Sequence, residues 1–423
     1  MREEFLHYLW RHSKYNKKEL TTTDGVELFV KSIGIHNHDS GPDFFNAQVR
    51  IGDQLWAGNV EIHVKSSDWY VHNHENDQAY DNVILHVVWE NDTVIHRNNG
   101  EIIPTLELSH FVDAKLLKNY EELFSKSPQW INCQSQFYKV DNFTIYNWLE
   151  RLYFERLEQK SVLIDDFLLQ SKNDWEAVLF WMLAKNFGLK LNGEAFLSVA
   201  KSFDFSVLRK ICHSREQLEA LLFGQSKLLK EDCNEAYSLS LREQYKYLKH
   251  KFKLNDKLVF PIKFFRLRPP NFPTIRLSQL AQLYFTHHNL FSIVMETNDL
   301  EEYYEIFRVS ALEYWNDHYT FGTTSKSRKK TLTKTFVDLL LINTIIPIKF
   351  AYSRYKGGGC NEEILNIIQK ITSEKNSIVD GFEALKPISK TAMDSQALIQ
   401  LKTQYCDKLK CLHCAVGNAI LSK

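Results

Sequence analysis

The chain has 423 residues, a length that predicts two or three domains. Its 52 basic and 52 acidic side chains cancel, which argues against a uniformly basic scaffold and leaves nucleic-acid binding to a local basic surface. No run of 18 apolar residues and no apolar leader for export occur, so we expect a cytoplasmic protein with no membrane partner.

The first 110 residues predict a small α/β domain. Glu3–His12 has the apolar spacing of a helix, and Asp24-Gly25 marks a turn after it. Short runs of alternating or continuous apolar residues then predict strands. These strands are Val26–Ile33, Phe45–Gly52, Leu55–Lys65 and Val83–Trp89, followed by a hairpin of Val94–His96 and Glu101–Leu108 around Asn98-Asn99-Gly100.

From about residue 111 the spacing of apolar residues becomes helical. Asp141 and Asp174 stand where the N-terminal caps of two long helices are expected. We therefore expect an α+β protein whose residues 1–110 form a mixed sheet with flanking helices. A helical domain is predicted for residues 111–345, and a helical segment with a cysteine-bearing tail for residues 346–423. The oligomeric state stays open.

The most distinctive chemistry lies in a predicted acidic hairpin. A turn at Gly52–Gln54 pairs residues whose numbers sum to 106 or 107, which places Asp43 beside His63 or its neighbour Val64. On the returning strand Glu61, His63 and Lys65 share one face, because side chains alternate with period two. Two adjacent carboxylates predict a site for Mg²⁺ or Mn²⁺. Asp43 and Glu61 would bind the metal, while His63 or Lys65 would position water.

Pro42-Asp43 followed by Glu61-Ile62-His63 resembles the PD-(D/E)XK nuclease superfamily. Its core is a helix, three meandering strands, a helix and a fourth strand. The resemblance implies metal-dependent hydrolysis of phosphodiester bonds in nucleic acid. Lys is usual where this chain has His63, and neutral His cannot supply a fixed positive charge, although Lys65 could stand in. This departure leaves open a non-catalytic nucleic-acid-binding or assembly protein with the same fold.

Seven of the sixteen histidines fall between His36 and His96, which raises a second possibility. His72 and His74 could place two imidazoles on one side of a loop, with His63 and His86 on neighbouring strands. A His-ligated Zn²⁺ would then replace the Mg²⁺ or Mn²⁺ site and predict a zinc hydrolase. His86 stands on a buried strand and equally fits a hydrogen-bonded core residue.

Three cysteines near the end, Cys406, Cys411 and Cys414, have the spacing C-x₄-C-x₂-C. A structural Zn²⁺ would need a fourth ligand, which Cys360 or His413 could supply. A [4Fe–4S] cluster would need four thiolates, for which Cys360 is the nearest candidate in the sequence. Free thiols in a reducing compartment are the third alternative.

The same tail is similar to that of helicase-associated PD-(D/E)XK nucleases, in which three closely spaced C-terminal cysteines help to hold an iron–sulfur cluster. That resemblance implies a partner helicase or ATPase. Cys133, Cys212 and Cys233 are isolated in the sequence, and we expect them to be buried small residues.

Two basic stretches are candidates for contact with nucleic acid. Arg268 and Arg276 interleave with phenylalanines, a combination that can bind phosphates while rings stack on bases. Arg328, Lys329 and Lys330 form a second stretch. The alternative is that the phenylalanines belong to the core and the cations pair with acidic helices.

Longer strings carry a resemblance over the whole chain. GPDFFNAQVRI, LWAGNVEIHVKSSDWYVHNH, YDNVILHVVW, RPPNFPTIR and YCDKLKCLHC are similar to those of a bacterial domain-of-unknown-function family, number 2851. This resemblance implies a shared architecture and assigns no activity.

Overall fold

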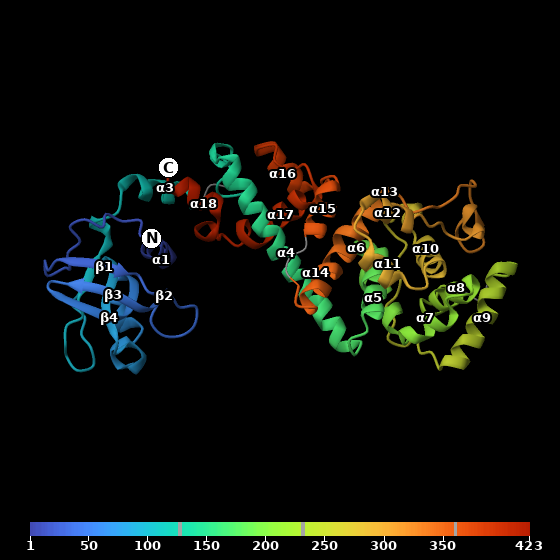
Figure 1. Cartoon of the computed structure of the whole chain (residues 1–423), viewed down its shortest axis with the longest axis horizontal. Helices are drawn as coiled ribbons and strands as arrows, with labels where there is room; N and C mark the ends of the chain where they lie inside the picture. The colour runs from blue at the N-terminus through green and yellow to red at the C-terminus, as the bar shows by residue number, and fades with distance from the viewer. Residues whose placement is uncertain (126–128, 230–232, 359–361) are drawn as a thin grey trace. The chain divides into compact units, whose positions relative to one another are not determined.

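The computed structural model describes residues 1–125, 129–229, 233–358 and 362–423. The protein is a mixed α+β structure with a mixed sheet near the N-terminus and a helical remainder (Figure 1). It divides into two compact units: Met1–Trp148 together with Leu401–Lys423, and Leu149–Gln400. Of the predicted C-terminal segment, residues 346–400 belong to the second unit and residues 401–423 to the first.

The first unit is built on one six-stranded sheet. Its strand order is β1-β3-β4-β5-β6, with β2 paired to β3; β3 and β4 are antiparallel, whereas β4, β5 and β6 run parallel. The strands are β1 (Leu28–Ser32), β2 (Ile35–His36), β3 (Phe44–Ile51), β4 (Gln54–Lys65), β5 (Val83–Glu90) and β6 (Thr105–Glu107).

The β3–β4 hairpin has a different register from the predicted one. Ile51 pairs with Gln54, and Phe44 pairs with Val60. The register shifts between Phe44 and Ala47, where Asn46 has a φ of 56°, a left-handed conformation typical of a bulge. The tighter turn and this shift together place Asp43 beside Glu61, two or three residues from the predicted position.

The hydrophobic core of the first unit lies on one face of this sheet. The helix α1 (Glu3–Arg11) inserts Phe5, Leu9 and Trp10, all fully buried, because its acidic and apolar residues segregate to opposite sides. They pack with Phe44, Val60 and other strand residues, and with α3 (Ala114–Leu123). A smaller cluster contains Trp69, Tyr80, Val83, Ile95 and Ile103.

The predicted hairpin after β5 forms only in part. Around Asn98-Asn99-Gly100 a turn is present and His96 bridges Ile102. The following strand β6, however, turns away to pair in parallel with β5. The C-terminal residues return to this unit, where Leu412 and Leu421 join the core and α18 (Ala415–Leu421) lies beside α3 (Figure 1).

The second unit is almost entirely helical. Asp174 caps α5 as predicted, since its carboxylate accepts hydrogen bonds from the N–H groups of Glu176 and Ala177. The helices are α4 (Asn142–Gln170), which begins in the first unit, α5 (Trp175–Phe187), α6 (Leu189–Lys201), α7 (Phe205–Ile211), α8 (Arg215–Gln225), α9 (Ala236–Phe252), α10 (Pro273–Thr286), α11 (Leu290–Glu296), α12 (Leu300–Ile306), α13 (Lys334–Leu340), α14 (Ile346–Tyr355), α15 (Glu362–Lys370), α16 (Ser377–Leu385) and α17 (Ala392–Gln400). A short hairpin of β7 (His318–Thr320) and β8 (Thr323–Thr324) joins them.

One helical stretch is long and apolar enough to span a membrane by length and composition. It is Lys334–Tyr355, which comprises α13, a π-helical turn and α14. Two thirds of its most apolar window, 67%, is buried inside the protein. The central helix of a soluble protein shows the same combination of apolar composition and burial.

Candidate metal centre

Asp43 and Glu61 hold each other through the backbone. The N–H of Asp43 donates to Glu61 Oε2 at 3.1 Å, and the N–H of Ile62 donates to Asp43 Oδ2 at 2.9 Å. Asp43 stands directly before β3 and Glu61 lies on β4, so the antiparallel pairing brings the two carboxyl groups together. Glu61 is only 5% exposed. The two carboxyl groups predicted as metal ligands are therefore adjacent and fixed in position.

Imidazoles surround the free side of the Glu61 carboxylate. Its Oε1 lies 3.3 Å from His74 Nε2 and 3.5 Å from His63 Nε2. His63 Nε2 lies 3.1 Å from His72 Nδ1. One ligand atom from each of His63, His72 and His74 falls within 4.8 Å of the others, which is close enough for one metal ion to be bound by all three. The alternative His-rich site predicted from the sequence thus adjoins the acidic one.

The segment after β4 positions two of these imidazoles. The helix α2 (Asp68–Val71) buries Trp69, and the chain then reverses at Asn73, whose φ is 58°. His74 follows and stacks on Tyr80 with ring centroids 3.8 Å apart. The aromatic contacts orient the His74 ring toward β4, so packing rather than hydrogen bonding positions its free nitrogen.

His86 on β5 orients the His63 ring by a hydrogen bond to its Nδ1 atom. Its Nε2 makes a 2.8 Å hydrogen bond with His63 Nδ1 and leaves His63 Nε2 directed toward Glu61. His86 is fully buried. Metal-binding imidazoles are commonly oriented in this way by a partner on the second nitrogen. His86 therefore acts as a positioning residue, in line with the prediction of a hydrogen-bonded core histidine.

Burial without a counter-cation perturbs the pKa values of Glu61 and His63. Desolvation and the neighbouring Asp43 carboxylate raise the pKa of Glu61 well above its usual range. Burial, with His74 and His72 nearby, lowers the pKa of His63 to about 3, so its imidazole is neutral. Neutral imidazole and carboxylate are the forms that bind metals. A buried carboxyl group facing neutral imidazoles is an arrangement that a cation would stabilise.

The surroundings of His74 Nε2 indicate whether a metal would fit this site. His74 Nε2 is buried, faces Glu61, and has no hydrogen-bond partner. Buried polar atoms without partners are rare unless an ion or water completes them. Imidazoles favour Zn²⁺ and related transition metals, whereas carboxylates suit Mg²⁺ or Mn²⁺. The mixed donor set of Glu61, His63 and His74 therefore fits Mn²⁺ or Zn²⁺ better than Mg²⁺.

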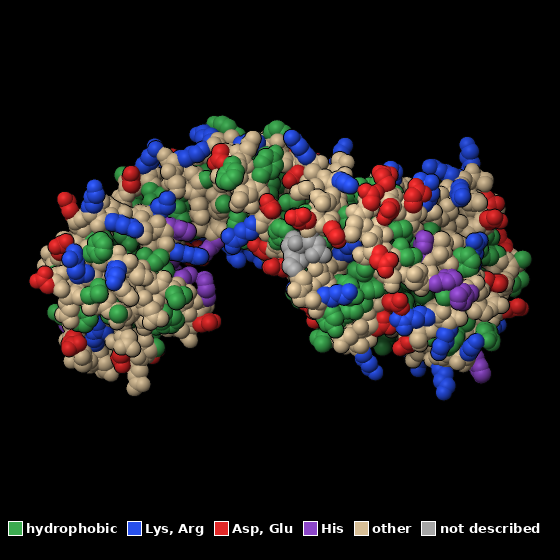
Figure 2. Space-filling model, in the orientation of Figure 1, with side chains coloured by type: hydrophobic (Ala, Val, Ile, Leu, Met, Phe, Trp, Pro, Cys, Tyr) green, Lys and Arg blue, Asp and Glu red, His purple; other side chains and the backbone are tan. Residues whose placement is uncertain are grey.

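The sequence did not indicate that α1 contributes to this site. His7 lies 3.2 Å from Asp43 Oδ2. Burial alone would lower the pKa of His7, but the hydrogen bond and charge of Asp43 raise it overall. Glu3, one turn earlier, lies 3.9 Å from His7. The spacing of Glu3 and His7 on one helical face was the available signal. Figure 2 shows histidine side chains at the surface of this unit.

Lys65 lies apart from the carboxylates. It is exposed, and its Nζ lies 3.4 Å from Glu90 Oε2 on the neighbouring strand. His63 and Lys65 share a face of β4 as predicted, yet only His63 contacts Glu61. The structure thus brings together Asp43, Glu61 and His63 and pairs Lys65 elsewhere.

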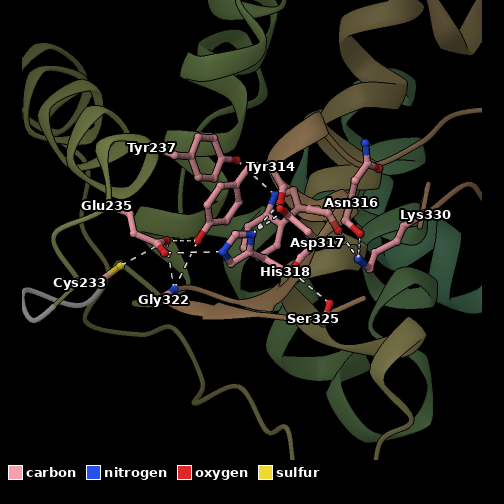
Figure 3. Close-up of polar contacts among 11 residues, drawn as sticks. Cys233, Glu235, Tyr237, Tyr314, Asn316, Asp317, His318, Gly322, Ser325 and Lys330 are labelled. Carbon is pink, nitrogen blue, oxygen red and sulfur yellow. Dashed lines mark hydrogen bonds and ion pairs between the residues drawn. The ribbon is translucent and has the colours of Figure 1, made fainter. Parts of the chain in front are cut away.

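The two predicted basic stretches are divided between the surface and the interior. Arg276 is 6% exposed, and its guanidinium donates to Gln279 and Asn271. Lys330 is 7% exposed and donates to the carbonyl oxygen of Asn316 at 3.0 Å (Figure 3). Neither cation is available to a phosphate at the surface. The exposed members of the two stretches are Arg268, Arg328 and Lys329.

A polar network near Lys330 was missed by the sequence analysis. His318 stacks on Tyr314 with ring centroids 4.1 Å apart, and its Nδ1 lies 2.7 Å from Asp317 (Figure 3). Glu235 accepts from the Tyr314 hydroxyl and from the N–H of Gly322. The network anchors the β7–β8 hairpin beside a cavity of about 790 Å³.

The tail cysteines Cys406, Cys411 and Cys414 all lie in the first unit, and none of the described cysteines forms a disulfide. His413, a predicted alternative ligand, is exposed. Cys360 lies outside the described residues, so its role as a ligand stays a prediction.

These features define an α+β protein with a carboxylate–imidazole cluster on a mixed sheet. The chain belongs to the family described as Protein of unknown function (DUF2851), whose model matches residues 3–377. Asp43, Glu61 and the surrounding histidines fall inside that span, and the three tail cysteines fall beyond it. No curated protein and no solved structure matches the chain.

Proposed function

We propose that the first unit catalyses metal-dependent hydrolysis of phosphodiester bonds in nucleic acid. The observation that carries this proposal is the fixed pair of carboxyl groups, Asp43 and Glu61, with His63 and His74 facing Glu61. A metal held there can polarise a phosphate oxygen and lower the pKa of bound water.

The order of elements supports the resemblance to the PD-(D/E)XK superfamily. The helix α1 is followed by the antiparallel strands β1, β3 and β4, then by α2, and β5 returns parallel to β4. Asp43 precedes the second of these three strands and Glu61 lies on the third, as the superfamily pattern requires. The added strands β2 and β6 are extensions at the edges.

The residues have separable roles in this proposal. Asp43 and Glu61 bind Mn²⁺ or Zn²⁺, and neutral His63 and His74 complete the donor set. His7, beside Asp43, can donate a hydrogen bond to a phosphate oxygen where the superfamily uses Lys. The exposed Arg268, Arg328 and Lys329 are proposed contacts for the nucleic-acid backbone. We place the activity in the cytoplasm and propose a helicase or ATPase as its partner.

The test is cleavage of labelled single- and double-stranded DNA and RNA with Mg²⁺, Mn²⁺ or Zn²⁺. Asp43→Asn and Glu61→Gln should each lower the metal-stimulated rate by roughly 100-fold or more, because metal activation is worth several kcal/mol. Glu90→Gln is the matched control, since Glu90 is an exposed carboxylate on the next strand that pairs with Lys65. Full activity in both site variants would place the chemistry elsewhere.

A second function is favoured by the grouping of His63, His72 and His74 around one position. These three imidazoles could bind Zn²⁺ and hydrolyse a substrate other than nucleic acid. Stoichiometric zinc that disappears in His72→Ala and His74→Ala, without cleavage of any nucleic acid, would support this function. Binding of nucleic acid without turnover under any of the three metals would instead support the non-catalytic alternative.

A further inference from the structure

Four cysteines converge in the first unit, although they come from two segments far apart in the sequence. Cys133 precedes α4, whereas Cys406, Cys411 and Cys414 lie in the returning C-terminal segment. Burial and the neighbouring Cys414 and Cys411 thiols raise the pKa of Cys133, and burial with the other three thiols raises that of Cys406. Burial and the neighbouring Cys414 thiol likewise raise the pKa of Cys411. Packing agrees, because Cys411 belongs to the hydrophobic core of the first unit and Cys133 packs against the same core.

The backbone is shaped to direct these sulfurs inward. The N–H of Leu409 donates to the carbonyl oxygen of Cys406, and that of Cys414 donates to Cys411, so two reverse turns bring the three thiols together. A Cβ on Gly417 would lie 2.1 Å from the Cys411 carbonyl oxygen, so only glycine permits this approach. The turn between Cys411 and Cys414 is thereby packed against α18.

Hydrogen bonds to sulfur also indicate a ligand role. The backbone N–H groups of Val416 and Gly417 donate to the Cys414 sulfur. Donors of this kind stabilise a thiolate rather than a thiol. Two cations lie near the four thiols: Lys402 is beside Cys406 and Arg2 is beside Cys411. Their charges would offset the negative charge of metal-bound thiolates.

We propose that Cys133, Cys406, Cys411 and Cys414 are the four ligands of a [4Fe–4S] cluster. Four thiolates are the required donor set, and each loses its proton when it binds iron. The proposal is independent of phosphodiester hydrolysis at Asp43 and Glu61.

A [4Fe–4S] cluster and a single zinc ion require different separations of the four sulfurs. Tetrahedral zinc with bonds of about 2.3 Å places its sulfurs roughly 3.8 Å apart. Among the described residues, the groups whose ligand atoms lie within 4.8 Å of one another do not include any three of these thiols. In a [4Fe–4S] cluster each thiolate binds a different iron, so the sulfurs are held farther apart.

The first experiment is metal and acid-labile sulfide analysis of the full chain purified without oxygen, or reconstituted with iron and sulfide. We expect about four irons and four sulfides per chain, with broad visible absorption. One zinc per chain and no sulfide would overturn the cluster assignment, and so would metal-free protein after reconstitution. These measurements need no variant and do not depend on nuclease activity.

Variants then identify the fourth ligand. Cys133→Ser should lose most of the iron and visible absorption, whereas Cys212→Ser and Cys360→Ser should keep both. Cys212 is a suitable control because it is a buried cysteine of the second unit. Far-UV circular dichroism identifies a variant that fails to fold, and in that case Cys133→His, which retains a metal-binding side chain, should show altered absorption. Wild-type iron and an unchanged spectrum in both Cys133 variants would exclude Cys133 as a ligand.

Discussion

Glu61 is the residue whose surroundings are hardest to reconcile with a purely structural role. It is buried on β4 and faces His63 and His74, while Asp43 adds a second carboxyl group. A buried carboxylate without a cation is costly, and its pKa rises accordingly. A bound metal would remove that cost, so we expect metal binding to stabilise the first unit against unfolding.

Metal affinity should depend on a residue that does not bind the metal. His86→Phe removes the hydrogen bond that orients His63, and losses of such partners typically cost about 10- to 100-fold in metal affinity. Titration of Mn²⁺ and Zn²⁺ by calorimetry measures this change. His110→Ala is the control, because the His110 side chain is 71% exposed. Equal affinities in wild type and His86→Phe would mean that His63 is not a ligand.

Glu219 in the second unit should couple stability to pH. Its carboxyl group is buried and accepts hydrogen bonds from the hydroxyls of Tyr237 and Ser278. Burial raises its pKa to about 7. A raised folded-state pKa stabilises the protein at low pH, and this contribution is lost as pH rises from about 4.5 to 7. Wild type should therefore lose about 3 kcal/mol relative to Glu219→Gln across that range. Urea unfolding at pH 4.5 and 8 measures the difference, and a pH-independent difference would contradict the expectation.

Alternation along β4 and turn chemistry are enough to predict that Asp43 meets Glu61, whose carboxylate contacts His63. The register was wrong by about two residues, partly because the turn is tighter than predicted, with Ile51 paired to Gln54, and partly because the bulge at Asn46 shifts the pairing again. The contact of His7 with Asp43 could not be predicted, since it depends on how α1 packs across the sheet. Local patterns thus identify ligands on adjacent strands and miss those supplied by tertiary packing.

At the scale of elements, the most accurate predictions rest on local chemistry. The strands β3, β4 and β5 and the capped helix α5 lie close to their predicted positions, because apolar periodicity and capping act within a few residues. The pairing of β6 was not predicted, since the choice of a parallel partner is made by distant residues. Arg276 shows the same limit, because its burial against Phe336 follows from helix packing.

The cap of α5 offers a direct test at this scale. Asp174→Ala removes two hydrogen bonds from the first turn and should destabilise the second unit by about 1–2 kcal/mol. Asp174→Asn keeps a capping oxygen and should retain most of the stability. Urea unfolding followed by circular dichroism compares the two variants. Equal losses would indicate that the ion pair with Arg209, rather than the cap, stabilises the helix end.

At the scale of the whole molecule, the first unit is discontinuous. Its core includes Leu412 and Leu421 from the C-terminal segment as well as Phe5 from α1. Each large apolar side chain contributes roughly 1.5–3 kcal/mol when fully buried. The tail is therefore part of the structural core of the first unit, a placement that no local pattern in the sequence reports.

Truncation after Gln400 should affect the two units unequally. The first unit would lose Leu412 and Leu421 from its core, whereas the second unit would keep all its helices. Hydrogen exchange followed by mass spectrometry should show rapid exchange in β3–β5 and unchanged protection in α5. Unchanged protection in the sheet would show that residues 401–423 contribute little to its stability.

The return of the tail also has a consequence during synthesis. The second unit is one uninterrupted stretch and can fold as soon as it leaves the ribosome. The sheet of the first unit is made earlier, yet its core lacks residues 401–423 while about 250 further residues are added, roughly 10–50 s at ordinary elongation rates. The part of its core that Leu412 and Leu421 cover is exposed to chaperones and aggregation for that interval. The first unit to be synthesised is therefore the last to be completed.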